Sequence, residues 1–462
     1  MTAEVQRRFT DGWTLLDSGG AGLCCLSALR HNQCAMELTD QARRLWSALR
    51  DDIPPALAPP DTYDEAEVAA MLRALGVALV EVIQPTQVVC DRLLKVAQRY
   101  TTHDVRVVVL PTILLIQIGT VGYEIDVTTR STTQLNLAGR VDDIAKLATA
   151  GAITPADAVR ELAAARAMPH RFPAAVTVLG YVITTLGFGM IINPTLGSVL
   201  GHGFLGLVVG LIALAPRLFP SLNAIVPTLA AAAVTILATW FVADAANIGV
   251  VRVIAPALVA VLPGLALTVA AMELADGQII AGSSRLIYAL VQLMLMIFGV
   301  ALGVAVAGRV PPQPPDPPFG PWAFYAAILV VGVGLYIYLS APRGSLVWLT
   351  LAVAVALLGQ KFGELFVSSA HAGALGAALV LPFALVAARL KLAPPAMVML
   401  VAAFWALVPG ALSFESLSAA AAGGPAAFTA LLSAGGAVIS IALGTLVSWS
   451  VLNAIGSRRT HR

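Results

Sequence analysis

Long apolar runs dominate the chain from about residue 173 onward, and short polar or proline-rich breaks separate them. A helix that crosses a lipid bilayer needs about 20 consecutive, mostly apolar residues. Runs of that length predict about ten transmembrane helices, near residues 173–193, 197–215, 222–243, 249–270, 283–307, 321–340, 344–360, 366–388, 394–413 and 427–453.

The first part of the chain has the shorter periodicities of a folded soluble domain. Two amphipathic helices are predicted on either side of Gln84-Pro85-Thr86, because proline interrupts the helical spacing of apolar residues. The β-branched run 105–119 predicts two strands, and the alternating run 122–129 predicts a third beside them. Two more helices follow, one ending at Gly151 and one beginning with Thr154 as its N-cap. We expect a small α+β domain.

Charge divides the chain at the same place. The 462 residues are 58% hydrophobic and 12% charged. Residues 1–171 hold 17 Lys+Arg and 20 Asp+Glu, whereas residues 172–462 hold 11 and 6. This composition indicates an integral membrane protein with a soluble part. The apolar stretch 15–29 is short and contains Asp17, so we expect no cleavable signal peptide and place the soluble part in the cytosol.

Four cysteines, at positions 24, 25, 34 and 90, all lie in this soluble part. Their irregular spacing and a reducing compartment predict neither disulfides nor a zinc site. We expect no cofactor and no metal.

These patterns predict the following organisation: an N-terminal extension at 1–62, partly disordered; a cytosolic α+β domain at 63–171; a first five-helix membrane repeat at 172–308; a Pro-rich connector at 309–320; a second five-helix membrane repeat at 321–455; and a cytosolic tail at 456–462.

The stretch 255–286 carries Pro263-Gly264 in the middle of a predicted span. Proline removes a backbone donor, so the helix is expected to break inside the bilayer. Polar backbone at that depth must be packed in protein or line a watery cavity, and such breaks mark binding sites in transporters. Pro409-Gly410 repeats the feature 146 residues later, and Gly197-Ser198 and Gly344-Ser345 have nearly the same offset. We interpret the membrane region as two similar units; a chance match is the alternative.

Five spans per unit is an odd number, so the second unit enters the membrane from the opposite side and the repeats should be inverted. The positive-inside rule supports this arrangement with both termini in the cytosol. The basic residues then expected in the cytosol are Arg217, Arg285, Arg343, Arg389, Lys391, Arg458 and Arg459, and those outside are Arg252, Arg309 and Lys361.

The predicted substrate site is the pair of half-helix N-termini that begin at Pro263-Gly264 and Pro409-Gly410. Their free amides and positive dipole ends suit a substrate carboxylate. Asn223 and Thr228 of the third span offer further hydrogen bonds, although small polar residues also serve helix packing.

Ionisable residues beside spans are hypotheses of function. Glu273 and Asp276 follow the first broken helix and are predicted to carry a proton or bind an amino group. The alternative places both in a loop at the cytosolic surface, where carboxylates are common. Arg285 is predicted to pair with one of them or to anchor the next helix at the lipid headgroups. Glu415 is a candidate gating or ion-pair residue at the outer mouth.

Several segments together resemble the threonine/serine exporter family, over roughly residues 66–455. They are LPTILLIQI at 110–118, Asn136-Leu137 before the helix that ends at Gly151, ITPADAVREL at 153–162, and LPGLALTVAAMELADGQIIAGSSRL at 262–286. The resemblance implies a secondary transporter that exports threonine and serine across the cytoplasmic membrane by proton-coupled antiport.

Other functions stay open at this point. A related two-component group resembles the same two halves, so export of a dicarboxylate such as succinate is the first alternative. A membrane-anchored enzyme or sensor, with the soluble domain as its active part, is the second. The chain has no GxxxxGK[ST] run for ATP hydrolysis, and we expect no catalytic residues. The expected partners are a small amino acid and the lipid bilayer, with no nucleic acid; a homo-oligomer is compatible with the sequence.

Overall fold

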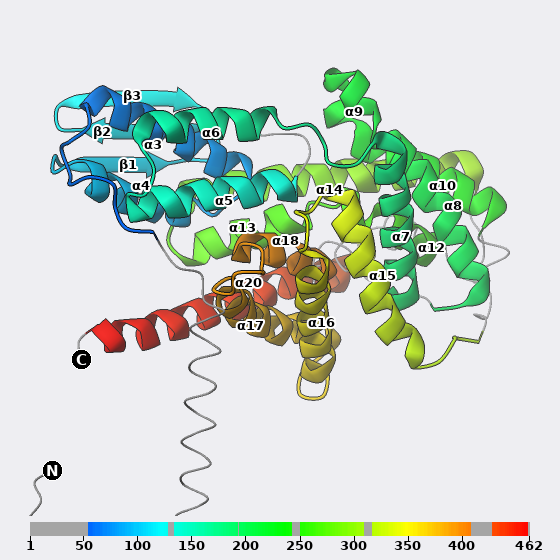
Figure 1. The fold of residues 1–462 in the computed structure, drawn as a ribbon. Coiled ribbons are helices and arrows are strands. Elements are labelled where there is room, and N and C mark those ends of the chain that lie inside the picture. The colour runs from blue at the N-terminus through cyan, green and yellow to red at the C-terminus, as the bar shows by residue number, and fades with distance from the viewer. Residues whose placement is uncertain are drawn as a thin grey trace, which may run out of the picture. The chain divides into compact units, whose positions relative to one another are not determined.

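The computed structural model describes residues 54–127, 134–192, 194–242, 250–308, 317–407 and 427–460 (Figure 1). The chain separates into the compact units Met1–Asp52 and Ile53–Arg462, and all of the described residues belong to the second.

The first elements form the predicted α+β domain. They are α3 (Glu65–Glu81), α4 (Thr86–Tyr100), β1 (Val105–Val109), β2 (Ile113–Ile118), β3 (Val121–Asp126), α5 (Leu135–Ala150) and α6 (Pro155–Ala167). The strands form an antiparallel sheet in the order β1-β2-β3, with Val107 opposite Ile116 and Ile116 opposite Tyr123. Gly151 ends α5 at a φ of 75°, and the Thr154 hydroxyl caps α6 by accepting from Asp157 N. The predicted helices, strands and cap are confirmed.

One face of the sheet forms the core of the α+β domain. Leu114, Ile116 and Ile118 of β2 are buried, whereas Leu115 and Gln117 between them are exposed, as the two-residue period of a strand requires. The helices α3 and α4 pack against the sheet.

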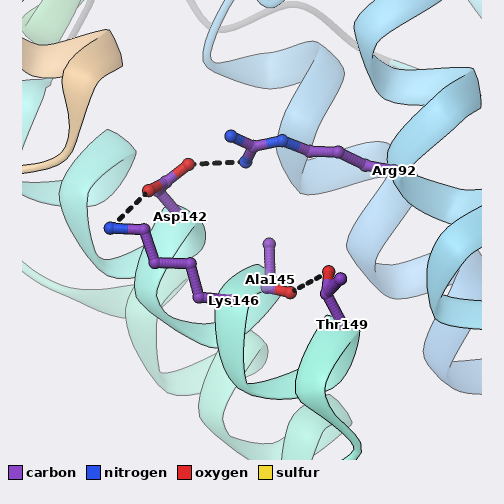
Figure 2. Close-up of polar contacts among 5 residues, drawn as sticks. All are labelled: Arg92, Asp142, Ala145, Lys146 and Thr149. Carbon is purple, nitrogen blue, oxygen red and sulfur yellow. Dashed lines mark hydrogen bonds and ion pairs between the residues drawn. The ribbon is translucent and has the colours of Figure 1, made fainter. Parts of the chain in front are cut away.

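An ion-pair cluster joins α4 to α5 on this domain (Figure 2). The buried carboxylate of Asp142 lies 2.5 Å from Arg92 Nη1 and 3.2 Å from Lys146 Nζ. One turn further along α5, the Thr149 hydroxyl donates to the carbonyl of Ala145 at 2.7 Å. Because both cations remain partly exposed, Asp142 is compensated at a modest desolvation cost.

Apolar helices make up the rest of the described chain. They are α7 (Ala174–Ile192), α8 (Leu196–Ile212), α10 (Val226–Phe241), α12 (Val250–Leu258), α13 (Gly264–Ala275), α14 (Ile279–Ala307), α15 (Trp322–Tyr338), α16 (Leu346–Gly363), α17 (Ser369–Ala387), α18 (Ala396–Leu407) and α20 (Ala427–Thr460), with the short α9 (Ala215–Leu218), η1 (Pro220–Ala224) and η2 (Val259–Val261) between them. Among the described residues, α7, α14 and α16 are long and apolar enough to cross a membrane, and shorter apolar helices accompany them. The protein is therefore a mostly helical membrane protein, and its described residues include one small sheet near the N-terminus.

The predicted fourth span is broken where the sequence places Pro263-Gly264. Helix α12 ends at Leu258, η2 follows, and Pro263 takes φ −77° and ψ 36° before α13 begins at Gly264. After the break, α13 continues to Ala275 and α14 begins at Ile279, so Asp276 lies in a short turn while Glu273 lies within a helix. The second predicted break, at Pro409-Gly410, lies outside the described residues.

Helices α7 and α15 pack closely because glycines remove side chains at their crossing. A Cβ atom on Gly187 would lie 2.9 Å from Val331 N, and one on Gly334 would lie 2.5 Å from Thr184 N. Gly180 in turn faces Ile337. As the residue numbers of the contacts increase along α7, the numbers of their partners decrease along α15. The two helices are therefore antiparallel.

Backbone hydrogen bonds tie the α+β domain to the end of α15. The amides of Leu135 and Asn136, at the start of α5, donate to the carbonyls of Leu339 and Ser340 at 2.9 and 3.1 Å. These bonds use two amides that have no partner within their own helix. The domain is thus joined to the apolar helices by specific contacts as well as by the chain.

Candidate functional site: a cavity at the broken helix and a buried ion pair

A cavity of about 230 Å³ lies beside the helix break. It is bounded by η2 and the start of α13, by the first two turns of α7, and by the last residues of α8, α15 and α18. The residues that line it are Ile83, His170, Thr177, Tyr181, Gly210, Ala213, Leu214, Val261, Leu262, Pro263, Leu265, Ala266, Gln292, Tyr338, Leu339 and Trp405.

Three aromatic side chains form one wall of this cavity. Tyr181 and Tyr338 meet edge to face with ring centroids 5.0 Å apart, and Tyr338 lies 6.0 Å from Trp405. The buried hydroxyl of Tyr181 donates to the carbonyl of Ala257, in α12, at 2.8 Å. Aromatic faces carry negative potential, which attracts cations that lie over them.

The start of α13 forms another wall. Pro263 is its N-cap and no side chain caps this end, while Pro263, Leu265 and Ala266 line the cavity. The first amides of any helix lack intrahelical acceptors and mark its positive dipole end. Among the described residues that line the cavity, none is Lys, Arg, Asp or Glu. The site is therefore polar through backbone, aromatic, amide and imidazole groups, without a charged carboxylate, ammonium or guanidinium.

A second feature, a buried ion pair, joins α13 to α14. Arg285 Nε lies 3.0 Å from Glu273 Oε2, and the two side chains are 11% and 1% exposed. Glu273 lies within α13 and is buried, so the interpretation of Glu273 as a surface-loop acid is wrong. The predicted pairing of Arg285 with one of the two acids is confirmed.

The α+β domain contacts this ion pair directly. The backbone amide of Thr86, the first residue of α4, donates to Glu273 Oε1 at 2.9 Å across a separation of 187 residues. The positive end of α4 thus adds to the stabilisation that Arg285 gives the carboxylate. Beside it, Gln278 Nε2 donates to Gln87 Oε1 at 2.7 Å. A polar contact therefore joins the start of α4 to the α13–α14 turn.

The other predicted site residues lie elsewhere. Asp276 is the exposed C-cap of α13, Asn223 is exposed in η1, and Thr228 lies in the first turn of α10. None of the three lines the cavity. Pro409, Gly410 and Glu415 lie outside the described residues.

Sequence reasoning missed the aromatic wall and the contribution of the α+β domain. Tyr181, Tyr338 and Trp405 come from three apolar helices, each with no local pattern that distinguishes it from an ordinary buried aromatic residue. Ile83 and His170 lie in turns that no motif marks. The one available signal was the proline-glycine break, which does line the cavity.

A cavity beside a broken helix, lined mainly by apolar helices, is the kind of site at which membrane transporters bind their substrates. The comparison with known families agrees. Residues 70–307, from α3 to the end of α14, match the family described as "Putative threonine/serine exporter". The match spans more than half of the chain, and the protein belongs to this family. No curated protein and no solved structure matches the chain. Family membership confirms the resemblance and indicates a transporter rather than an enzyme.

Proposed function

We propose that the protein is a secondary transporter that exports threonine and serine across the cytoplasmic membrane in exchange for protons. The observation that carries this proposal is the cavity at the Pro263 break, found in a chain that belongs to an exporter family. The substrate-binding residues would be those of the cavity.

The chemistry of the cavity suits a small amino acid. Its carboxylate would accept from the free amides at the start of α13, beginning at Gly264, and its ammonium would lie against Tyr181, Tyr338 and Trp405. The cavity, of about 230 Å³, is smaller than the sites of about 300–1,000 Å³ that hold drug-sized ligands. A dicarboxylate would bring two negative charges into a cavity whose described lining residues include no Lys or Arg to pair with them. Because an unpaired buried charge is costly, the lining favours a zwitterion over succinate.

The position of the cavity supports loading from the cytosol. It is bounded by the start of α7 and the end of α15, the helix ends nearest to the α+β domain, which we place in the cytosol. A substrate that leaves the cell would enter the protein at this end.

Glu273 is the proposed proton carrier. Its buried carboxylate is stabilised most while it is charged, by Arg285 and by the Thr86 amide. Protonation would weaken both interactions and loosen the contact between α13 and the start of α4. Asp276, the other predicted carrier, is exposed and holds no comparable position.

The packing of α7 on α15 supports the two inverted five-helix repeats. An offset of 147 residues relates Gly187 to Gly334 and Thr184 to Val331, and the contacts are reciprocal: Gly187 meets Val331, and Gly334 meets Thr184. Reciprocal contacts are the mark of a two-fold axis. Because α7 and α15 each begin a proposed repeat and are antiparallel, the second repeat would be inverted.

A second, equivalent crossing occurs within each proposed repeat. Gly299 of α14 meets the carbonyl of Thr228 in α10, and Gly444 of α20 meets the carbonyl of Ala374 in α17. The two pairs are related by offsets of 145 and 146 residues, close to the offset between Pro263 and Pro409.

Counterflow in proteoliposomes tests the proposed substrate. Radiolabelled threonine is added outside vesicles that contain unlabelled threonine, serine or succinate. We expect accumulation with internal threonine or serine and none with succinate. Accumulation with internal succinate as well would show that the carrier also accepts a dicarboxylate, and accumulation with none of the three would contradict amino-acid export.

A further inference from the structure

Ile83 lies within the sequence of the α+β domain, but its side chain packs against the membrane helices. It lies in the turn between α3 and α4, and it lines the cavity together with Pro263 and Tyr338. Its neighbours Val80 and Val82 are buried in the core of the α+β domain, whereas Ile83 packs against the core formed by the apolar helices.

The backbone of Ile83 takes a conformation that its side chain disfavours. Its φ is 59°, and a β-branched residue in this region is a rare outlier. Such conformations persist where the surroundings determine them, and they cluster at functional sites.

Contacts on both sides fix this turn. Ile83 N donates to Val80 O at 3.0 Å and Gln84 N donates to Leu79 O at 3.3 Å, which continues the end of α3. Three residues after Ile83, the amide of Thr86 binds Glu273 of α13. The side chain of Ile83 is therefore placed in the cavity by an anchored turn rather than by a free loop.

We propose that Ile83 is a specificity-determining residue of the substrate site, supplied by the α+β domain. This inference rests on the proposed function. Its branched aliphatic side chain is an apolar wall that occupies room in a cavity of about 230 Å³, and it limits the length of the substrate side chain. Threonine and serine fit beside it, whereas leucine and other longer side chains are excluded by volume; valine, which has the size of threonine, is not excluded in this way. The α+β domain thus takes part in substrate selection.

Replacing Ile83 with glycine tests this role, because glycine adopts a φ of 59° without strain and removes the whole side chain. Counterflow of labelled threonine is measured with threonine, serine, valine or leucine as the internal exchange partner. We expect the preference for threonine over leucine to fall about tenfold or more, the discrimination that apolar volume gives in a binding pocket. A control is Leu57→Gly, which truncates an exposed aliphatic residue just before α3, outside the cavity, and should leave the preference unchanged.

Thiol labelling gives a second readout that does not depend on transport. Ile83→Cys is made in a protein whose four native cysteines are replaced by serine, and Glu124→Cys, at an exposed position of β3, serves as the control. Saturating threonine should slow modification at position 83 severalfold and leave position 124 unaffected. If Ile83→Gly fails to fold, this labelling experiment still tests whether Ile83 lines the substrate site.

The outcomes separate the two proposals. If the unmodified protein gives no threonine counterflow, the proposed function fails. If it exchanges threonine, while Ile83→Gly keeps the original preference or threonine does not protect Cys at position 83, only the role of Ile83 is overturned.

Discussion

Glu273 receives its two stabilising contacts from parts of the chain far apart in sequence. Arg285 lies one helix further on, and Thr86 lies 187 residues earlier. Removing one member of a buried ion pair leaves an uncompensated charge, which typically costs about 3–5 kcal/mol. The carboxylate therefore has a structural role whether or not it carries a proton, and a test of coupling must separate the two.

Substitution of Glu273 with glutamine makes this separation. The amide oxygen can still accept from Thr86, but the side chain no longer titrates. We expect Glu273→Gln to keep threonine counterflow and to lose the response of threonine flux to an imposed pH gradient. Both are measured in proteoliposomes. A double variant, Glu273→Gln with Arg285→Gln, removes the unpaired cation and should restore any lost stability without restoring the pH response.

The matched control for this experiment is Asp276→Asn, which neutralises an exposed acid three residues away. It should leave both counterflow and the pH response intact. A pH response that persists in Glu273→Gln, or that disappears in Asp276→Asn, would place the proton carrier elsewhere than Glu273.

At the scale of single elements, the crossing of α7 and α15 depends on missing side chains. Gly187 and Gly334 let the backbones approach, as small residues do between membrane helices. Alanine at either position must push the backbone of the other helix away, because the new Cβ would lie within 3 Å of the backbone nitrogen of Val331 or Thr184 as well as of their side chains.

We expect Gly187→Ala and Gly334→Ala to lower stability by similar amounts, roughly 1–3 kcal/mol each, as overpacking does. The control is Gly203→Ala in α8, where the new Cβ would meet only Leu186 Cδ2 at 3.5 Å, an ordinary contact. It should be neutral or slightly stabilising, since alanine favours helix. Thermal unfolding of the purified protein in detergent measures all three. Equal losses in all three variants would argue against the reciprocal crossing.

At the scale of the whole molecule, the proposed inverted repeats and cytosolic termini predict which loops face the cytosol. Leu365, after α16, and Leu392, between α17 and α18, are 73% and 79% exposed, and one helix separates them. With cysteine at each position in a protein without native cysteines, a membrane-impermeant thiol reagent should label Leu365→Cys on intact cells. It should label Leu392→Cys only after permeabilisation. The reverse labelling pattern would mean that the protein has the opposite orientation in the membrane. Labelling of both positions from the same side would mean that α17 does not cross the membrane.

The sequence by itself determined the features that depend on neighbouring residues. The α+β elements, the cap at Thr154 and the break at Pro263 follow from periodicity, turn chemistry and the missing proline donor, all of which act within a few positions. The length of the apolar runs likewise determined that this is a membrane protein, because bilayer thickness sets the length of a span.

Local sequence patterns gave a wrong prediction where helix α13 continues past the end of its apolar run. Glu273 looked like a loop residue because charge ends a hydrophobic stretch, yet α13 continues to Ala275. Only the tertiary structure shows why: Arg285 and the Thr86 amide compensate the charge inside the fold. No short-range signal encodes partners at such separations.

The cavity was decided by the tertiary structure for the same reason. Tyr181, Tyr338 and Trp405 converge on it from α7, α15 and α18, and Ile83 comes from the α+β domain. Each is an unremarkable apolar or aromatic position in its own segment. Packing between distant segments, rather than any segment's own periodicity, turns them into one site around Pro263.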